Sequence, residues 1–334
     1  MFLVPDEGKS RGLLTVTKKR REIPQRKAWQ LSRKQMAVFS LVCVVAIAAV
    51  STVLLFLQQS PSNHFSLKAA IVDQLSGELP NPTFVENVTA VLKEYGFSVD
   101  YTDKPDVEFF KGLARSNYGI IVLRGHSALR QPYNSTVDFF TSEPFNIQRH
   151  VQEISEELVV EAVLNYTGTE KHYFAITPKF VEKLEGNFPK SIVIAMECWS
   201  LKEGLKQMAE AFIKREAKAY VGWSDWVDIS HVDNETTKLI RRLLVENKTL
   251  EQAVNEASPD PFFFSKQGYY PESAGNLRLS DLVKEKEATD SSLPAAILSY
   301  CYNIALAVVD SSHKKLKDLK WTTNQTDLLA SSAA

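Results

Sequence analysis

Two short segments constrain the fold of this chain more than any other feature. Residues 118–127 (YGIIVLRGHS) and 191–200 (SIVIAMECWS) are apolar runs rich in β-branched residues, and each ends abruptly in a reactive side chain, His126 or Cys198. Such runs are typical of strands buried in a parallel sheet. The carboxyl ends of parallel strands meet at one edge, where active crevices form. We therefore expect a thiol and an imidazole at that edge, the minimal pair for a cysteine nucleophile and its base.

The segments around these runs alternate between strand and helix patterns. From residue 67 onward the order is β-α-β-α-β, which is typical of a parallel sheet covered by helices. We predict an α/β fold with a mostly parallel sheet and helices on both faces. The expected strands are 67–75, 97–103, 118–127, 191–196 and 218–224, and the expected helices are 81–96, 107–117, 201–216, 235–248 and 249–257, the last opening with a capping box from Thr249 to Gln252.

Three segments depart from this alternation. Residues 128–180 hold few helix signals and three candidate hairpin strands, so they are predicted to form an insertion over the sheet edge near the site. Residues 258–292 are aromatic and then polar, which favours loops. The apolar run 293–309 is short for a membrane span and is interrupted by tyrosines and an asparagine, so we interpret it as a buried helix.

A membrane anchor is predicted before the domain. Residues 36–57 form a run of 22 residues without charge, proline or glycine, and a helix rising about 1.5 Å per residue would cross a hydrocarbon core of roughly 30 Å. A cleaved signal peptide is the alternative, but its apolar region is usually shorter and nearer the N-terminus. Residues 1–57 carry ten Lys/Arg and three acids, and all the basic residues precede the run, which predicts a cytoplasmic N-terminus.

These features divide the chain and predict its location. We expect a single-pass protein of the cell membrane whose C-terminal domain is extracytoplasmic. The net charge of −1 hides an acidic balance after residue 57, which argues against nucleic acid as a partner. The predicted parts are a basic cytoplasmic tail (1–35), a transmembrane helix (36–57), a linker (58–64), an α/β ectodomain (65–312) and a flexible C-terminal tail (313–334).

Glycosylation signals and cysteines agree with an external domain. All six N-x-S/T sequons lie after the apolar run, which predicts a glycoprotein. The sequons are at Asn87, Asn134, Asn165, Asn234, Asn247 and Asn324. Of the three cysteines, Cys43 falls in the predicted span. A disulfide between Cys198 and Cys301 is the alternative to a free nucleophile at Cys198.

The segment from Cys198 to Ala257 carries a family resemblance. Its strand, cysteine, helix, strand and helix resemble, in order and spacing, the C-terminal half of CHAT domains, which belong to the caspase, gingipain, legumain and separase group of cysteine peptidases (clan CD). The matching residues are Ala211-Phe212, Glu216-Ala217, Tyr220-Val221-Gly222, Trp226 and Lys248-Thr249-Leu250. The resemblance extends more loosely back to Leu67. It implies a caspase-like fold with a catalytic cysteine and histidine.

Two positions depart from the family pattern. Ser127 follows the histidine, where the family commonly has glycine, and Met196 stands two residues before the cysteine, where many relatives carry an acid that binds a basic substrate side chain. Specificity for Arg or Lys is therefore not implied.

The predicted site combines nucleophile, base and oxyanion hole. Cys198 would attack, His126 would take its proton, and the backbone N–H groups of Ser127 and Cys198 would stabilise the oxyanion. A helix starting soon after Cys198 would favour the thiolate through its dipole. The candidate substrate-pocket residues are Glu197, Trp199, Trp223, Ser224, Asp225 and Asp228.

No metal or cofactor is expected, because the sequence has no H-E-x-x-H, C-x-x-C, G-x-S-x-G or P-loop motif. The sequence thus predicts a membrane-anchored cysteine endopeptidase acting on a peptide or protein substrate. The alternative is a catalytically inactive peptidase-like ectodomain that acts as a binding or receptor module. Nothing in the sequence indicates an oligomeric state.

Overall fold

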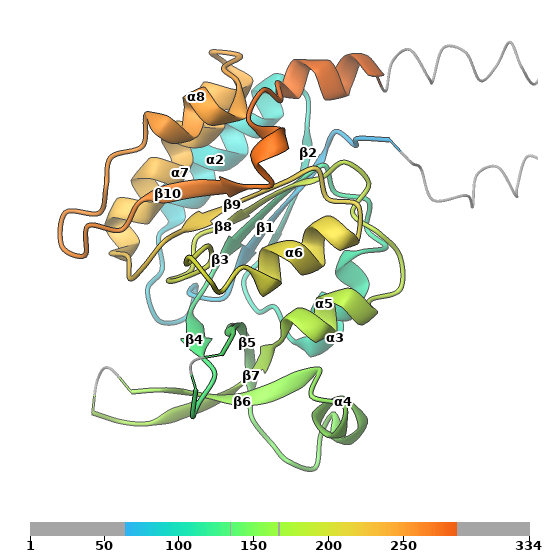
Figure 1. The fold of residues 1–334 in the computed structure, drawn as a ribbon, viewed down its shortest axis with the longest axis vertical. Helices are drawn as coiled ribbons and strands as arrows, with labels where there is room; N and C mark the ends of the chain where they lie inside the picture. Colours follow the sequence, from blue (N-terminus) through green and yellow to red (C-terminus); the bar gives the residue numbers. More distant parts are fainter. Residues whose placement is uncertain (1–63, 134, 166–167, 286–334) are drawn as a thin grey trace, which may run out of the picture. The chain divides into compact units, whose positions relative to one another are not determined.

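A six-stranded, mostly parallel sheet forms the centre of the domain. The computed structural model describes residues 64–133, 135–165 and 168–285. The strand order is β10-β9-β8-β3-β1-β2, with β10 antiparallel to β9 and the other neighbours parallel (Figure 1). The mixed α/β fold with a mostly parallel sheet is therefore confirmed. The strands are β1 (Lys68–Asp73), β2 (Ser98–Thr102), β3 (Ile120–Arg124), β8 (Ile192–Ala195), β9 (Ala219–Trp223) and β10 (Gln267–Tyr270).

One face of this sheet packs against α2 (Pro82–Tyr95), α7 (Ile229–Leu244) and α8 (Leu250–Asn255). Helix α2 begins where the Asn81 side chain accepts the Phe84 N–H, and it ends at Gly96, whose φ of 107° suits glycine. Helix α8 begins with the expected capping box between Thr249 and Gln252.

The opposite face packs against α3 (Val107–Leu113), α5 (Pro178–Lys183) and α6 (Gln207–Lys214). Phe110, Phe180 and Phe212, one from each helix, are buried in the same hydrophobic cluster as the side chains of this sheet face. Helices therefore cover both faces, as the alternating pattern predicts.

A second sheet is inserted between β3 and β8. It is antiparallel, with the order β4-β5-β7-β6. Its strands are β4 (Ser127–Leu129), β5 (Val137–Pro144), β6 (Val159–Leu164) and β7 (Lys171–Ile176), and α4 (Val151–Ser155) lies between β5 and β6. The expected hairpin strands are present, and β4 begins directly after His126.

Some elements differ from the sequence expectation, most clearly at the starts of α6 and α7 and in residues 258–292. Helix α6 begins at Gln207 rather than at residue 201, because residues 199–206 form turns in which Trp199 and Gly204 have positive φ. Helix α7 begins at Ile229 rather than at residue 235, because Asp228 accepts the His231 N–H and caps it. The region expected to be loops holds β10 and the short turn η1 (Glu272–Ala274).

Several predictions concern residues outside the described part of the chain. These are the basic tail, the span at residues 36–57, the apolar run 293–309, Cys43, Cys301, Asn134 and Asn324. Among the helices of the described residues, none has the length and apolar content needed to cross a bilayer.

Candidate active site

His126 and Cys198 stand at equivalent positions beyond two paired strands. Strands β3 and β8 are parallel neighbours with Leu123 opposite Ala195, and the Met196 N–H donates to the Leu123 carbonyl. His126 and Cys198 each follow this last pair by three residues. The register therefore brings the two residues to adjacent places at the carboxyl edge of the sheet, where ligands bind in open α/β folds.

A hydrogen bond joins the two loops that carry them. Ser127 Oγ donates to the Cys198 carbonyl oxygen. On the other side of β4, the Phe140 N–H donates to the His126 carbonyl while Ser127 lies opposite Phe139. In an antiparallel ladder this pattern turns the Ser127 N–H away from β5. That direction suits the oxyanion role predicted for Ser127, which stays a prediction.

The Cys198 thiol is half-buried and free. Its Sγ lies 4.0 Å from the Val227 carbonyl oxygen. Burial, with the nearby carboxylates of Glu197 and Asp225, raises the pKa of the Cys198 thiol to about 11. Because α6 begins only at Gln207, the helix dipole expected to favour a thiolate does not act at Cys198. The thiol is therefore protonated at neutral pH and needs a base.

His126 has the properties of such a base. Burial lowers the pKa of its imidazole, and the nearby charge of Glu78 opposes that change. The ring packs edge-on against Phe140, with ring centroids 5.9 Å apart. Its backbone N–H donates to Gln74 Oε1, at the carboxyl end of β1. A mostly neutral imidazole can accept the thiol proton.

Glu78 is a functional candidate that sequence reasoning missed. Its Oε2 lies 3.6 Å from His126 Nε2, a close electrostatic contact that is longer than a hydrogen bond. Its Oε1 accepts hydrogen bonds of 2.8 Å from both Lys171 and Tyr173 on β7. Burial raises the pKa of Glu78, but these two bonds outweigh it and lower the pKa overall. Glu78 precedes α2 in an unremarkable polar stretch, so no local pattern marks it.

A buried ion network supports the same edge of the sheet. Arg124, two residues before His126, has a side chain only 1% exposed. It pairs with Asp73 at 2.8 Å and makes a two-pronged contact with Asp233 at 2.8 and 3.0 Å. Asn81 donates to Asp233 as well. The network ties the ends of β1 and β3 to α2 and α7. No sequence pattern predicted these ion pairs.

Glu197 does not face the solvent, although it adjoins the nucleophile. The residue is 3% exposed, and Oε2 has no hydrogen-bond partner among the described residues. Oε1 lies 3.5 Å from the point that a Cβ on Gly125 would occupy. The hydroxyl of Tyr220, which is fully buried, likewise has no hydrogen-bond partner within the described part of the chain. Burial raises the pKa of Glu197 well above its usual range.

The other predicted pocket residues each make contacts that hold the surrounding structure in place. Trp199 is nearly buried and has a left-handed φ of 54°, a conformation held by its N–H to the Asp225 carbonyl and its Nε1–H to Asp225 Oδ1. Trp223 is fully buried in the core beside His231, and Asp228 serves as the α7 cap. Ser224 Oγ accepts the Lys266 N–H and so joins the end of β9 to the segment before β10.

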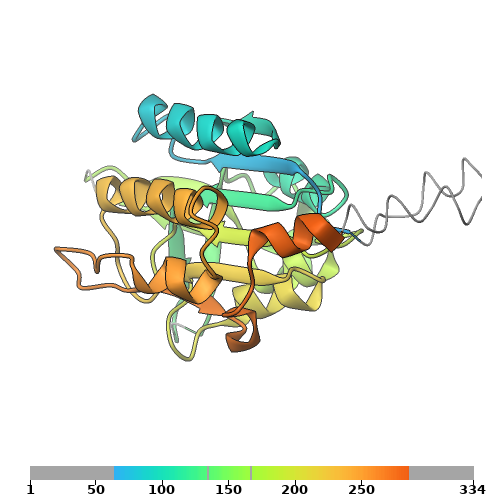
Figure 2. The ribbon, with the colours of Figure 1, turned by 90° about the horizontal axis from the view of Figure 1, so that it is seen from above.

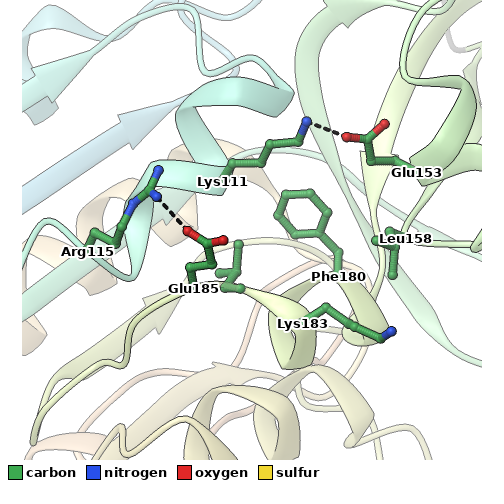
Figure 3. A pocket seen from close by; sticks show the side chains of 8 residues that line it. Lys111, Arg115, Glu153, Leu158, Phe180, Lys183 and Glu185 are labelled. Atoms are coloured by element: carbon green, nitrogen blue, oxygen red, sulfur yellow. Dashed lines mark hydrogen bonds and ion pairs between the residues drawn. The ribbon is translucent and has the colours of Figure 1, made fainter.

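A pocket of about 260 Å³ lies apart from these residues (Figure 3). Its lining includes Phe180, Leu158 and two ion pairs, Lys111 with Glu153 and Arg115 with Glu185. Neither His126 nor Cys198 belongs to it. Its fifth charged residue, Lys183, pairs with Glu156 outside the lining, so all the charged groups already have partners and we assign the pocket no role in the chemistry.

The predicted glycosylation sites among the described residues lie on the surface of the domain. The four sequon asparagines in the described residues are exposed, at positions 87, 165, 234 and 247, and their glycosylation stays a prediction.

No group of three or more His, Cys, Asp or Glu suited to a metal ion occurs in the part of the chain that the structure describes.

Comparisons with known proteins give only distant similarities. No family model and no curated protein matches the chain. The crystal structure of the Arg-specific cysteine proteinase gingipain R (RGPB) aligns with a TM-score of 0.36 and 8% identity, covering 55% of this chain and 38% of that one. A structure described as a protease aligns with a TM-score of 0.42 and 10% identity, covering 65% of this chain and 49% of that one. The chain spans less than half of either protein, and TM-scores this low assign neither family nor activity.

Proposed function

We propose that this chain is a cysteine endopeptidase with a caspase-like domain, in which Cys198 is the nucleophile and His126 the general base. The observation that carries the proposal is the shared register of the two residues beyond Leu123 and Ala195, at the edge where β3 and β8 end. The bond from Ser127 to the Cys198 carbonyl keeps the two loops together. Nucleophile, base and an orienting third group are the arrangement that covalent catalysis requires.

The proton movements follow from the two pKa directions. Cys198 rests as a thiol and His126 as a neutral imidazole. As Sγ attacks the carbonyl carbon of a peptide, its proton passes to His126, and the C–S bond forms. His126⁺ then protonates the leaving amine while the C–N bond breaks. Water, deprotonated by His126, hydrolyses the thioester and regenerates the thiol.

Glu78 has the orienting role in this scheme. Its contact at His126 Nε2 favours the tautomer with a proton on that nitrogen, which leaves Nδ1 to accept the proton of Cys198. The negative charge also stabilises the imidazolium that forms during the attack. Because Lys171 and Tyr173 hold the carboxylate, the inserted sheet contributes to the site.

A thiol-directed probe and a set of peptide substrates test the proposal. Cys198→Ala should abolish both labelling and turnover, and His126→Ala should lose turnover to a similar degree. The double variant should lose no more than either single one, since cooperating catalytic residues are non-additive. His172→Ala, at an exposed histidine of the inserted sheet, is the matched control and should keep activity. Turnover by Cys198→Ala would overturn the proposal.

A binding module is the second candidate, and one observation favours it. The raised pKa of Cys198 means that the thiol is unreactive until a base acts on it. A domain that binds a peptide without cleaving it would have no need of a reactive thiolate. Binding of a peptide without turnover, together with a Cys198 thiol that is not alkylated faster than free cysteine, would favour this candidate.

The proposed enzyme is anchored in the cell membrane and acts outside the cytoplasm. This part of the proposal rests on the uncharged run at residues 36–57 and on the basic residues before it. Sequons after that run support the same orientation.

A further inference from the structure

Four exposed aromatic side chains gather beside the candidate site. Trp226 is 51% exposed, and the consecutive residues Phe262, Phe263 and Phe264 are 70%, 48% and 76% exposed. We call these four residues the aromatic surface. Single exposed apolar side chains are ordinary, but a contiguous group of large aromatics on a soluble face marks an interaction site.

Ring contacts join this surface to the nucleophile. Trp199, which directly follows Cys198, contacts Trp226 with ring centroids 4.2 Å apart. Trp226 in turn lies 6.3 Å from Phe263. The aromatic surface therefore continues from the residue beside Cys198 to the tip of the loop between α8 and β10.

Buried polar groups hold the loop in its exposed form. Asp260 is fully buried, and its Oδ1 accepts the N–H groups of both Phe262 and Phe263. Its Oδ2 accepts the Asp228 N–H, and Ser265 Oγ accepts the Asp225 N–H. The rings thus cannot turn into the core without breaking buried hydrogen bonds, so the surface is pre-organised for a ligand.

Two of the three acids near Cys198 already hold partners, and the third is buried. Asp225 pairs with Lys202 at 3.2 Å and accepts the Trp199 Nε1–H. Asp228 caps α7, and Glu197 is 3% exposed. A basic side chain of a ligand would have to compete with Lys202 for Asp225 or with the α7 cap for Asp228, and Glu197 is buried.

The aromatic surface lies at the opposite end of the domain from both ends of the described chain. The loop is bonded to the carboxyl end of β9 through Ser224 and Lys266. His64 precedes the amino end of β1, and Glu285 pairs with Lys190, just before β8. Both views show the described chain leaving the domain at the end opposite this loop (Figures 1 and 2). The aromatic surface therefore lies beside the candidate site and away from both ends of the described chain.

We infer that the aromatic surface binds aromatic or aliphatic side chains of an extended substrate peptide, next to the bond that Cys198 attacks. The inference rests on the proposed function and names its substrate class: polypeptides with apolar residues near the cleavage point, and not substrates chosen for Arg or Lys. Trp226 and Phe263 supply the walls, and Phe262 and Phe264 extend the contact along the peptide.

Peptide binding to the Cys198→Ala protein tests this without any need for turnover. Fluorescent peptides that differ only in one central residue, Phe, Leu, Ala or Lys, are titrated and followed by anisotropy. The Phe and Leu peptides should bind about tenfold or more tightly than the Ala and Lys peptides, as expected where aromatic contacts dominate an interface. The double substitution Phe262→Ser and Phe263→Ser should remove that preference. Val245→Ser changes an equally exposed apolar side chain at the end of α7 and should leave it intact.

Three outcomes would overturn the inference. The first is a preference for the Lys peptide, or one that survives the double substitution. The second is binding of neutral phosphatidylcholine vesicles that depends on Phe262 and Phe263, which would make a bilayer the occupant. The third is a concentration-dependent dimer in sedimentation that the same substitution dissociates. Peptide binding with the expected preference but without turnover by the native protein would leave the inference standing and overturn the peptidase instead.

Discussion

Glu78 Oε2 lies 3.6 Å from His126 Nε2, while Lys171 and Tyr173 hold the other oxygen of the same carboxylate. This places the group that orients the base on the loop after β1 and its supports on the inserted sheet. The His126 imidazole, between β3 and β4, thereby has a carboxylate partner that two hydrogen bonds hold in position. The consequence can be measured at His126 itself.

Glu78→Gln should lower the pKa of His126. In the native protein the negative charge of Glu78 raises that pKa and opposes the effect of burial. NMR titration of the His126 ring protons measures this directly. Turnover should fall by roughly tenfold to a hundredfold, less than the roughly hundredfold to ten-thousandfold that a general base itself contributes, because the base remains in place. Glu161→Gln, which changes the exposed partner of His172, is the control. An unchanged pKa of His126 in Glu78→Gln would show that the two residues do not interact.

Arg124→Met should destabilise the fold by about 3–5 kcal/mol, because Asp73 and Asp233 would be left buried without their cation. Urea unfolding followed by fluorescence gives the free energy. Arg115→Met removes an exposed pair with Glu185 and should cost less than about 1 kcal/mol. Equal losses for the two substitutions would contradict the importance assigned to burial.

Glu197→Gln should make the domain more stable, by an amount that grows with pH. Burial raises the pKa of Glu197 in the folded state, so the folded state binds a proton more tightly than the unfolded chain. Stability is then lost as pH rises above the unfolded pKa of about 4.3. Unfolding of both proteins at pH 5 and pH 8 measures the difference, with the exposed Glu203→Gln as control. A gain in unfolding free energy that is the same at both pH values would show that Glu197 does not titrate in this way.

The N-terminus should remain in the cytoplasm and the domain outside. Protease added to intact cells should degrade the domain and leave a fragment that contains the tail and residues 36–57. Full protection of the chain would refute the orientation. A mature protein that lacks residues 1–57 would instead indicate a cleaved signal peptide.

Glycan should be found on some of the exposed sequons at Asn87, Asn165, Asn234 and Asn247. Mass spectrometry of protein from its native source tests this, with peptides treated and untreated by a glycosidase. Asn87 lies within α2 and Asn234 within α7, and both should be less occupied than Asn165 and Asn247, since a helical sequon cannot adopt the turn that exposes its amide. Unmodified peptides at all four positions would remove glycosylation as support for an external domain.

The sequence by itself determined the layered α/β fold and the two residues at its carboxyl edge. The β-branched runs before His126 and Cys198 become β3 and β8, because apolar side chains on both faces are stable only between two layers of helices. The caps at Asn81 and Thr249 are local signals, and both mark helix starts as expected. Such features depend on neighbours in the chain, which a sequence displays directly.

Only the tertiary structure decided which polar groups surround the pair. Glu78 reaches His126 across 48 positions, and Arg124 meets Asp233 across 109. No periodicity links residues so far apart, because their contact depends on strand order and on the placement of the inserted sheet. Burial likewise placed Trp223 and Phe212 inside and left Trp226 and Phe262 outside. Identical residue types take opposite environments according to the layers that happen to cover them, and that is a property of the packed chain.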